Sequence, residues 1–297
     1  MNKIGLHQGY WRQTPAEHAG IERWLELTKQ TTCEVFEIGP SIILPMSKQE
    51  RADFKKLIAD NGMTLSINGG YTPTNDIASD DPAIRKIGVE YGKSVLEAMA
   101  DVGCDRWSGI NYSAWLRRPD CENLTYDEKQ RIRELSLESM KQIIKTAEDC
   151  GVKYCFEIVN RFEQFLLNTS AEGVAFCEEI GSPNAQLLLD TFHMNIEEDS
   201  IVDALEYAQT RGRLGHVHVG ESNRRVPNFD GKTHLDWDGI LGILKKTGYE
   251  GFITMEPFMK MGLTTICVWR DLSHDADVDQ MVVYARDAAN FLRGKLA

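Results

Sequence analysis

Four side chains that could bind a hard metal ion lie in the second half of the sequence, and each follows a short apolar run: Glu157, Asp190, His218 and Glu256. Successive members of this set are 33, 28 and 38 residues apart. A strand with its crossover helix takes about 30 residues or more. The spacing therefore predicts one ligand at the C-terminal end of each of four successive parallel strands, which is where active sites lie in a barrel of such units.

Three carboxylates and one imidazole form a mostly oxygen donor set, which suits Mn²⁺, Mg²⁺ or Co²⁺ better than a closed zinc site. Each residue also has a structural interpretation. Glu157 could be an ion-pair partner, Asp190 a helix N-cap, and Glu256 a loop charge before a proline. Four unrelated structural roles would not be expected to share one position in consecutive units, so the pattern favours a metal site.

Two histidines compete for the imidazole position. His216 and His218 are two residues apart, so on a strand they point to the same side. His218 lies nearer the C-terminal end, where the other ligands gather. We therefore predict His218 as the ligand and His216 as a deeper residue that packs in the core or supports the ligand.

Apolar runs and amphipathic segments alternate along the whole chain. We expect strands at 3–7, 34–38, 64–68, 105–110, 153–158, 186–190, 214–219 and 252–256. We expect helices at 16–30, 48–61, 83–102, 126–150, 170–181, 200–211, 237–247 and 276–295. Alternating strands and helices predict a parallel sheet, and eight such units predict a closed (β/α)8 TIM barrel. No linker divides the sequence, so we expect one domain over residues 1–297.

The loops after three of the expected strands carry aromatic side chains: Tyr10, Trp11, Tyr71, Tyr112 and Trp115. Ligand pockets are lined largely by apolar and aromatic groups, and a sugar can place a ring face on them. The same side chains could instead pack the top of the barrel. We select Trp115 and, from the loop after the last strand, Phe258 as substrate contacts.

Composition excludes several classes of protein. The net charge of −12 disfavours nucleic-acid and anionic-membrane partners, which require a basic patch. No apolar run reaches the roughly 18 residues of a membrane span, and the N-terminus lacks a signal-peptide core, so we expect a cytoplasmic protein. The 7 cysteines are odd in number and form no CxxC pair, which argues against a disulfide framework and a cysteine zinc site.

Several long strings resemble the ketose 3-epimerases, the group that contains D-tagatose 3-epimerase and D-allulose (D-psicose) 3-epimerase. They are EIVNRFE (157–163), LLDTFHMNIEEDS (188–200), GHVHVGESNRRVP (215–227), MEPF (255–258) and VWRDLS (268–273). The resemblance is strong over roughly the second half of the chain. The first half matches mainly in architecture and in short pieces such as the Gly-Tyr-Trp after the first strand.

The resemblance implies a TIM barrel with one divalent ion, most often Mn²⁺ with Co²⁺ or Mg²⁺ as alternatives, and no organic cofactor. The four ligands would be those already identified, and Glu157 and Glu256 would also be the catalytic acid–base pair. The resemblance further assigns substrate binding to Glu163, His193 and Arg224. The distance from His218 to Arg224 fits the family pattern, whereas counting from His216 does not.

The family also implies a homodimer or homotetramer acting on a small-molecule sugar. Loops 228–237 and 261–268 depart from the usual family form, so the preferred sugar and the role of these loops stay open. The expected reaction is C3 epimerisation of a free ketose of the D-tagatose, D-fructose/D-allulose or L-ribulose type. One glutamate would take the C3 proton to give a cis-enediolate, and the other would return a proton to the opposite face.

Other functions share parts of this pattern. An aldose–ketose isomerase, a hydroxypyruvate-type isomerase or an inosose dehydratase could use the same barrel and metal layout. A repair endonuclease of the same fold would need a basic groove, which the charge of −12 disfavours. A sugar-binding protein with a vestigial site is disfavoured by the intact ligand set.

Overall fold

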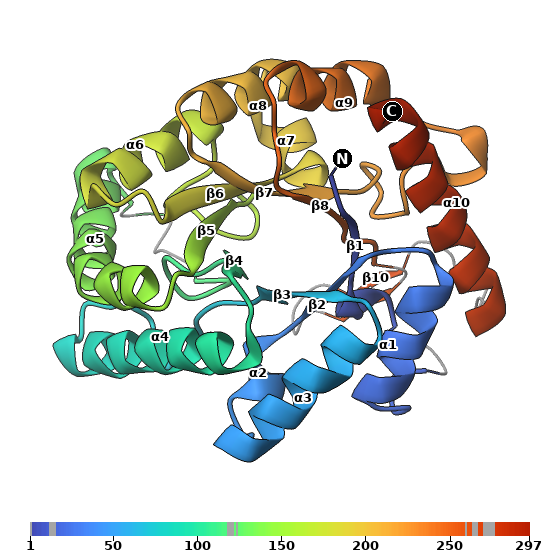
Figure 1. Cartoon of the computed structure of the whole chain (residues 1–297). Coiled ribbons are helices and arrows are strands. Elements are labelled where there is room, and N and C mark those ends of the chain that lie inside the picture. The colour runs from blue at the N-terminus through green and yellow to red at the C-terminus, as the bar shows by residue number, and fades with distance from the viewer. Residues whose placement is uncertain are drawn as a thin grey trace.

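The computed structural model describes residues 2–11, 16–117, 122, 124–258, 260–262, 267–269 and 277–297. Its centre is a closed barrel of parallel strands, and β1 pairs with β8 to close the ring. The strands are β1 Ile4–His7, β2 Val35–Ile38, β3 Thr64–Asn68, β4 Arg106–Gly109, β5 Lys153–Ile158, β6 Ala185–Asp190, β7 Leu214–Val219 and β8 Phe252–Met255. Figure 1 shows the strands at the centre with the helices around them. The predicted (β/α)8 TIM barrel is confirmed.

The outer ring holds one long helix for each strand. These helices are α1 Ile21–Gln30, α3 Lys48–Asp60, α4 Pro82–Val102, α5 Tyr126–Asp149, α6 Ser170–Ile180, α8 Ile201–Thr210, α9 Trp237–Lys246 and α10 Val278–Leu296. Ser47 and Thr169 start α3 and α6 with capping boxes, in which a glutamate side chain returns a hydrogen bond to the cap. Gly103 and Gly181 end α4 and α6 at φ 71° and 78°, a left-handed geometry that glycine adopts without a steric penalty.

The expected elements are all present, with bounds that differ by a few residues. The first helix was predicted over 16–30 and begins at Ile21, because Gly20 adopts φ 83° and interrupts the helical geometry. The last strand was predicted over 252–256 and ends at Met255, so Glu256 lies one residue beyond it. Within the described residues, no helix combines the length and apolar character that crossing a membrane requires.

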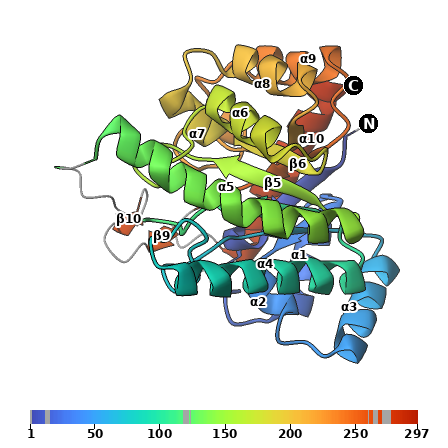
Figure 2. The ribbon, with the colours of Figure 1, turned by 90° about the vertical axis from the view of Figure 1, so that its left-hand side faces the viewer.

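The sequence did not predict several short elements at the barrel ends. They are η1 Gln8–Tyr10, α2 Pro40–Ile43, α7 Thr191–Glu197, η2 Phe229–Gly231 and the antiparallel pair β9 Lys260–Gly262 and β10 Cys267–Trp269. The β9–β10 pair lies at the end of the barrel toward which β5 points (Figure 2). Segments 263–266 and 270–276, which include most of VWRDLS and part of loop 261–268, lie outside the described residues.

The inside of the barrel contains a buried polar layer below the strand ends. His216 lies at its centre, with Nδ1 2.8 Å from the Ser108 hydroxyl and Nε2 2.9 Å from the Thr254 hydroxyl. All three residues are 0% exposed. Gly5 of β1 leaves room for this layer, because a Cβ there would lie 2.5 Å from Thr254 Oγ1. His216 is therefore a deep residue, as the sequence predicts, and the structure adds that two hydroxyl groups hold its ring.

Candidate active site and metal centre

The four predicted ligands meet at the C-terminal ends of β5 to β8. Glu157 lies near the end of β5, Asp190 ends β6, His218 lies near the end of β7 and Glu256 follows β8. One ligand atom from each residue lies within 4.8 Å of the ligand atoms of the others, and all four residues are buried. In the sequence, successive members of this group are up to 38 residues apart. The group contains His218 and not His216.

His218 has the arrangement of a metal-binding histidine. Its Nε2 lies 2.7 Å from Glu37 Oε1, which fixes the ring and favours the tautomer with the proton on Nε2. Its Nδ1 is buried and has no hydrogen-bond partner among the described residues. This nitrogen lies 3.4 Å from Glu256 Oε2, on the side of the carboxylates. A buried imidazole nitrogen facing three carboxylates fits a divalent cation.

Asp190 combines the two interpretations that the sequence left open. Oδ1 accepts a hydrogen bond from the backbone N–H of Phe192 at 2.9 Å, so Asp190 is the N-cap of α7. Oδ2 accepts a hydrogen bond from Arg224 Nη1 at 2.6 Å. The helix cap orients the carboxylate, and its second oxygen faces the cluster.

Arg224 links most of the predicted site residues. Its Nη1 donates to Asp190 Oδ2 and, at 2.9 Å, to Glu256 Oε2, while Nη2 lies 3.1 Å from His193 Nε2. The guanidinium also stacks on Phe192 at 3.9 Å and lies 5.3 Å from the ring of Phe258. This fixed cation offsets part of the carboxylate charge in the site.

The two candidate acid–base residues have opposite pKa shifts. Burial raises the pKa of Glu157 well above its usual value, and the nearby Glu256 carboxylate raises it further. Burial also acts to raise the pKa of Glu256, but His218 and Arg224 outweigh it and hold that pKa far below its usual value. Two carboxyl groups whose pKa values are driven apart by their surroundings are typical of an acid and a base in one site.

Glu163 and His193 adjoin this pair. Glu163 accepts hydrogen bonds from Trp115 Nε1 at 3.2 Å and from Asn160 Nδ2 at 3.3 Å. His193 Nδ1 accepts a hydrogen bond from the Asn160 backbone N–H at 3.2 Å, and its Nε2 lies 3.6 Å from Glu157 Oε1. Burial and the Arg224 charge hold the pKa of His193 well below its usual value, so its imidazole is neutral.

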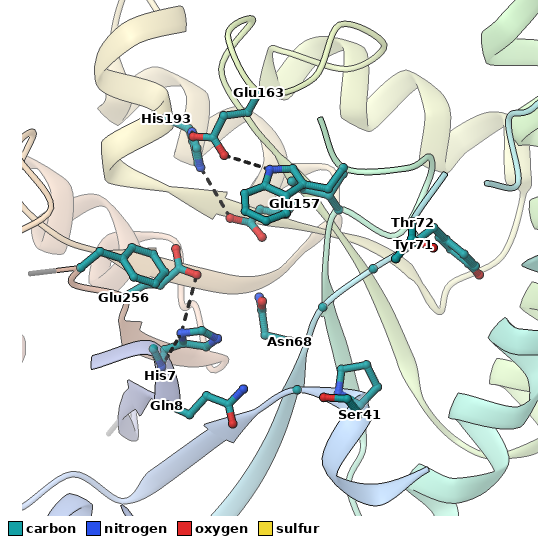
Figure 3. A pocket seen from close by; sticks show the side chains of 18 of the residues that line it. His7, Gln8, Ser41, Asn68, Tyr71, Thr72, Glu157, Glu163, His193 and Glu256 are labelled. Carbon is teal, nitrogen blue, oxygen red and sulfur yellow. Dashed lines mark hydrogen bonds and ion pairs between the residues drawn. The ribbon is translucent and has the colours of Figure 1, made fainter. Parts of the chain in front are cut away.

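A cavity of about 580 Å³ opens above the cluster, within the range of small-molecule sites. Its lining includes seven of the predicted site residues: Glu157, Glu163, His193, Arg224, Glu256, Phe258 and the half-exposed Trp115. Figure 3 shows the side chains of Glu157, Glu163, His193 and Glu256 at this cavity. Asp190 and His218 are 0% exposed and hold the inner side of the cluster.

The loop aromatics divide between cavity and core. Tyr71 and Trp115 line the cavity. Tyr10, Trp11 and Tyr112 are at most 1% exposed and pack in the core, where the Tyr10 hydroxyl donates to the Met281 carbonyl at 2.9 Å. For these three, packing of the barrel top is the correct interpretation.

Glu37, which lies in β2 and is 0% exposed, was not predicted as a site residue. Its Oε1 binds His218, and its Oε2 accepts a hydrogen bond from the Ser66 hydroxyl at 2.6 Å. Burial acts to raise the pKa of Glu37, but His218 and His216 outweigh it and lower that pKa to about 2. A carboxylate inside the apolar run VFEI was the available signal.

His7 was also missed. It ends β1 and lines the cavity, with Nδ1 3.9 Å from Glu256 Oε1. Its Nδ1 accepts a hydrogen bond from the Gly9 backbone N–H at 3.1 Å. A polar residue at the end of the first strand has the same position in its unit as the four ligands, and this register could have identified it.

Glu221 lies in the loop after β7 and holds loop 228–237 in place. The carboxylate accepts hydrogen bonds from the Asn228 backbone N–H at 2.6 Å, from Thr233 Oγ1 at 2.8 Å and from Trp237 Nε1 at 3.0 Å. Glu221 therefore supports this loop, which is one of the two segments expected to depart from the usual family form.

Comparison with known proteins gives consistent matches. Residues 25–279 match the family of xylose isomerase-like TIM barrels. The chain is 36% identical to D-psicose 3-epimerase of Ruminiclostridium cellulolyticum, over 98% of this chain and 97% of that one. It is 34% identical to L-ribulose 3-epimerase of Mesorhizobium japonicum, over 87% of this chain and 82% of that one.

Solved structures agree with the sequence matches. A crystal structure of D-psicose 3-epimerase with D-tagatose from Clostridium cellulolyticum H10 superimposes with a TM-score of 0.89, at 34% identity and 99% coverage of both chains. A D-psicose 3-epimerase in the presence of D-fructose gives a TM-score of 0.87 at 36% identity, again with 99% coverage of both chains. The chain therefore belongs to the xylose isomerase-like TIM barrels and, among them, to the ketose 3-epimerases, which makes it an isomerase.

Proposed function

We propose that this enzyme inverts C3 of a free ketose with the help of one divalent metal ion held by Glu157, Asp190, His218 and Glu256. The observation that carries the proposal is the approach of these four buried side chains to within 4.8 Å of one another at the floor of a cavity. Three carboxylates and one imidazole suit Mn²⁺, with Co²⁺ or Mg²⁺ as alternatives. A bound ion would polarise the C2 carbonyl and so acidify the C3 proton.

Glu157 and Glu256 are the proposed acid–base pair. One carboxylate accepts the C3 proton, which leaves an enediolate, and the other delivers a proton to C3 from the opposite face. The carbon skeleton and its oxidation level are unchanged, so no other reactant is needed. The surroundings of the two groups shift their pKa values in opposite directions, which supports different roles for the two carboxyl groups.

The other lining residues bind and orient the sugar. Arg224 and His193 present polar atoms beside Glu157 and Glu256, and Glu163 is positioned by Trp115. These groups would hold substrate hydroxyls, while Trp115 and Phe258 would cover apolar faces of the sugar. Orientation of this kind accounts for a large part of enzymatic rate enhancement.

The names of the relatives guide the choice of substrate class. D-psicose and L-ribulose 3-epimerases are the matched enzymes, and the solved relatives were studied with D-tagatose and D-fructose. We therefore propose an unphosphorylated ketose of this kind as the substrate.

A panel of free ketoses, each incubated with the purified protein and Mn²⁺ or with a chelator, tests this function. The expected result is C3 epimers with Mn²⁺ and no product with the chelator. Aldose products would instead indicate an aldose–ketose isomerase, and a dehydrated product would indicate an inosose dehydratase. Absence of any product with every metal would contradict the proposal.

A further inference from the structure

The wall of the cavity formed by β1 and β3 carries two primary amides. Gln8 follows β1 directly, and Asn68 is the last residue of β3. Both line the cavity that contains Glu157 and Glu163. Figure 3 shows the two amides on the side of the cavity away from Glu157 and Glu163, and both reach into it. Neither residue takes part in the chemistry proposed above.

These amides have unused hydrogen-bonding atoms. Gln8 is 6% exposed, and its Oε1 is buried without a hydrogen-bond partner among the described residues. The same holds for Asn68 Nδ2. By contrast, the amide of Gln164, in the loop after β5, donates to the Ala114 carbonyl at 2.9 Å and accepts from the Phe165 backbone N–H at 2.7 Å. Buried polar atoms are almost always paired, so each of these two atoms can form a hydrogen bond with a water molecule or with a polar group of a ligand.

The local backbone leaves room for these side chains. A Cβ on Gly39 would lie 3.1 Å from Gln8 Nε2 and 3.8 Å from the Asn68 carbonyl oxygen, so the three residues converge. Gly39 has φ −80°, a conformation open to any residue. Its glycine is therefore not required by backbone geometry, and the missing side chain provides space for the Gln8 amide.

The chemistry of this wall suits neutral hydroxyl groups. Gln8, Asn68 and Ser41 supply amides and a hydroxyl. The one guanidinium among the described lining residues belongs to Arg224, which is bound to Asp190 and Glu256. A phosphate or carboxylate would be expected to require a cation at this end. A hydroxyl can donate to Gln8 Oε1 and accept from Asn68 Nδ2, which would satisfy both atoms.

We propose that Gln8 and Asn68 form a polar subsite for the terminal hydroxymethyl group of the sugar, so that the enzyme selects an unphosphorylated ketohexose. The inference rests on the proposed function, which places C2 and C3 beside Glu157 and Glu256. The remaining carbons C4 to C6 then extend toward the opposite wall. The C6 hydroxyl is the group that a ketohexose has and a ketopentose lacks.

Discrimination between D-psicose and its 6-deoxy analogue tests this subsite. We expect the wild-type kcat/KM to favour D-psicose by about tenfold or more, because a missing hydroxyl leaves both amides unpaired. In Gln8→Met and Asn68→Leu the preference should fall below about threefold. The main cause should be a higher KM for D-psicose, because the lost contact binds the ground state and the transition state equally. Gly39→Ala, which crowds the Gln8 amide, should act in the same direction.

Thr72→Val is the matched control at the same cavity. The Thr72 hydroxyl is paired within its own loop, 2.9 Å from Thr74 Oγ1 and 2.9 Å from Asn75 Oδ1. Its removal should leave the preference for D-psicose unchanged. Equal wild-type activity on both sugars, or equal losses on both sugars in Gln8→Met, would overturn the subsite.

A binding measurement separates this subsite from the proposed reaction. Saturation-transfer NMR with D-psicose, with and without Mg²⁺, reports which sugar protons contact the protein without requiring turnover. We expect strong transfer to the C6 protons in the wild type and at least a twofold weaker signal in Gln8→Met. Transfer to C6 without epimerisation would reject the reaction and keep the subsite. No transfer to C6 in an active enzyme would reject the subsite alone, and neither transfer nor activity would reject both.

Discussion

Two replacements of Glu37 should weaken metal binding to different extents, depending on whether the new side chain can still accept the hydrogen bond from His218. Glu37 Oε1 receives the Nε2 proton of His218 at 2.7 Å, and Oε2 is held by the Ser66 hydroxyl at 2.6 Å. Glutamine keeps an acceptor for His218 and loses the charge. Leucine keeps the volume and loses both.

The expected sizes follow from these contacts. Hydrogen bonds to charged groups contribute about 1.5 to 3 kcal/mol and neutral ones about 0.5 to 1.5 kcal/mol, so Glu37→Gln should cost about 1.4 kcal/mol, or tenfold in affinity. Glu37→Leu also leaves the buried Nε2 proton unpaired, which adds about 1 to 3 kcal/mol. A loss of about 100-fold or more is expected, at the upper end of the range for residues that orient a ligand.

Calorimetric titration of the metal-free protein with Mn²⁺ measures the effect directly. Glu34→Gln is the control, because it removes the same charge from an exposed residue next to β2, which contacts Arg293 and the Ile4 backbone N–H, each at 3.4 Å. Thermal unfolding of each metal-free variant shows whether the barrel is intact. If Glu37→Leu binds Mn²⁺ within twofold of the wild type, the proposed role of Glu37 in orienting His218 is refuted.

Three further outcomes follow from the same contacts. Trp115→Phe keeps a ring and loses the bond to Glu163, so steady-state kinetics should show KM raised about two- to tenfold with kcat nearly unchanged; a fall in kcat alone would contradict this. Ser108→Ala leaves His216 Nδ1 without its hydroxyl partner and should lower the free energy of unfolding by about 1 to 3 kcal/mol in urea titrations, whereas no change would show that the bond is dispensable. Mn²⁺ at 100 times its dissociation constant should raise the free energy of unfolding by about 2.7 kcal/mol, and a chelator should reverse this; an unchanged melting temperature would argue against a metal site.

The barrel and the ligand cluster could be predicted because their signals are local. A charged or imidazole side chain at the end of an apolar run marks a strand end, and the regular spacing shows that such ends share one face of the barrel. His218 could be separated from His216 by strand position alone. Asp190 was considered as a helix N-cap, but α7 itself was not among the expected helices; the aspartate serves as both cap and candidate ligand.

The remaining features depend on contacts across long stretches of sequence. Glu37 and His218 are 181 residues apart, and no spacing rule connects them. The position of Gln8 and Asn68 on one wall of the cavity likewise depends on the closure of the barrel between β1 and its neighbours. Loop conformation decides whether an aromatic residue such as Tyr10 or Trp115 faces the core or the cavity, and composition does not encode it.

Deuterium exchange at C3 tests the two-carboxylate chemistry most directly. The wild type, incubated with a ketose and Mn²⁺ in deuterated water, should incorporate one deuterium at C3, read by NMR. Glu157→Gln and Glu256→Gln should each slow this exchange by about 100-fold or more, as expected when a general acid or base is removed. Metal content is measured in parallel, so that loss of the ion is distinguished from loss of the base. Exchange at the wild-type rate in both variants would contradict the proposed mechanism.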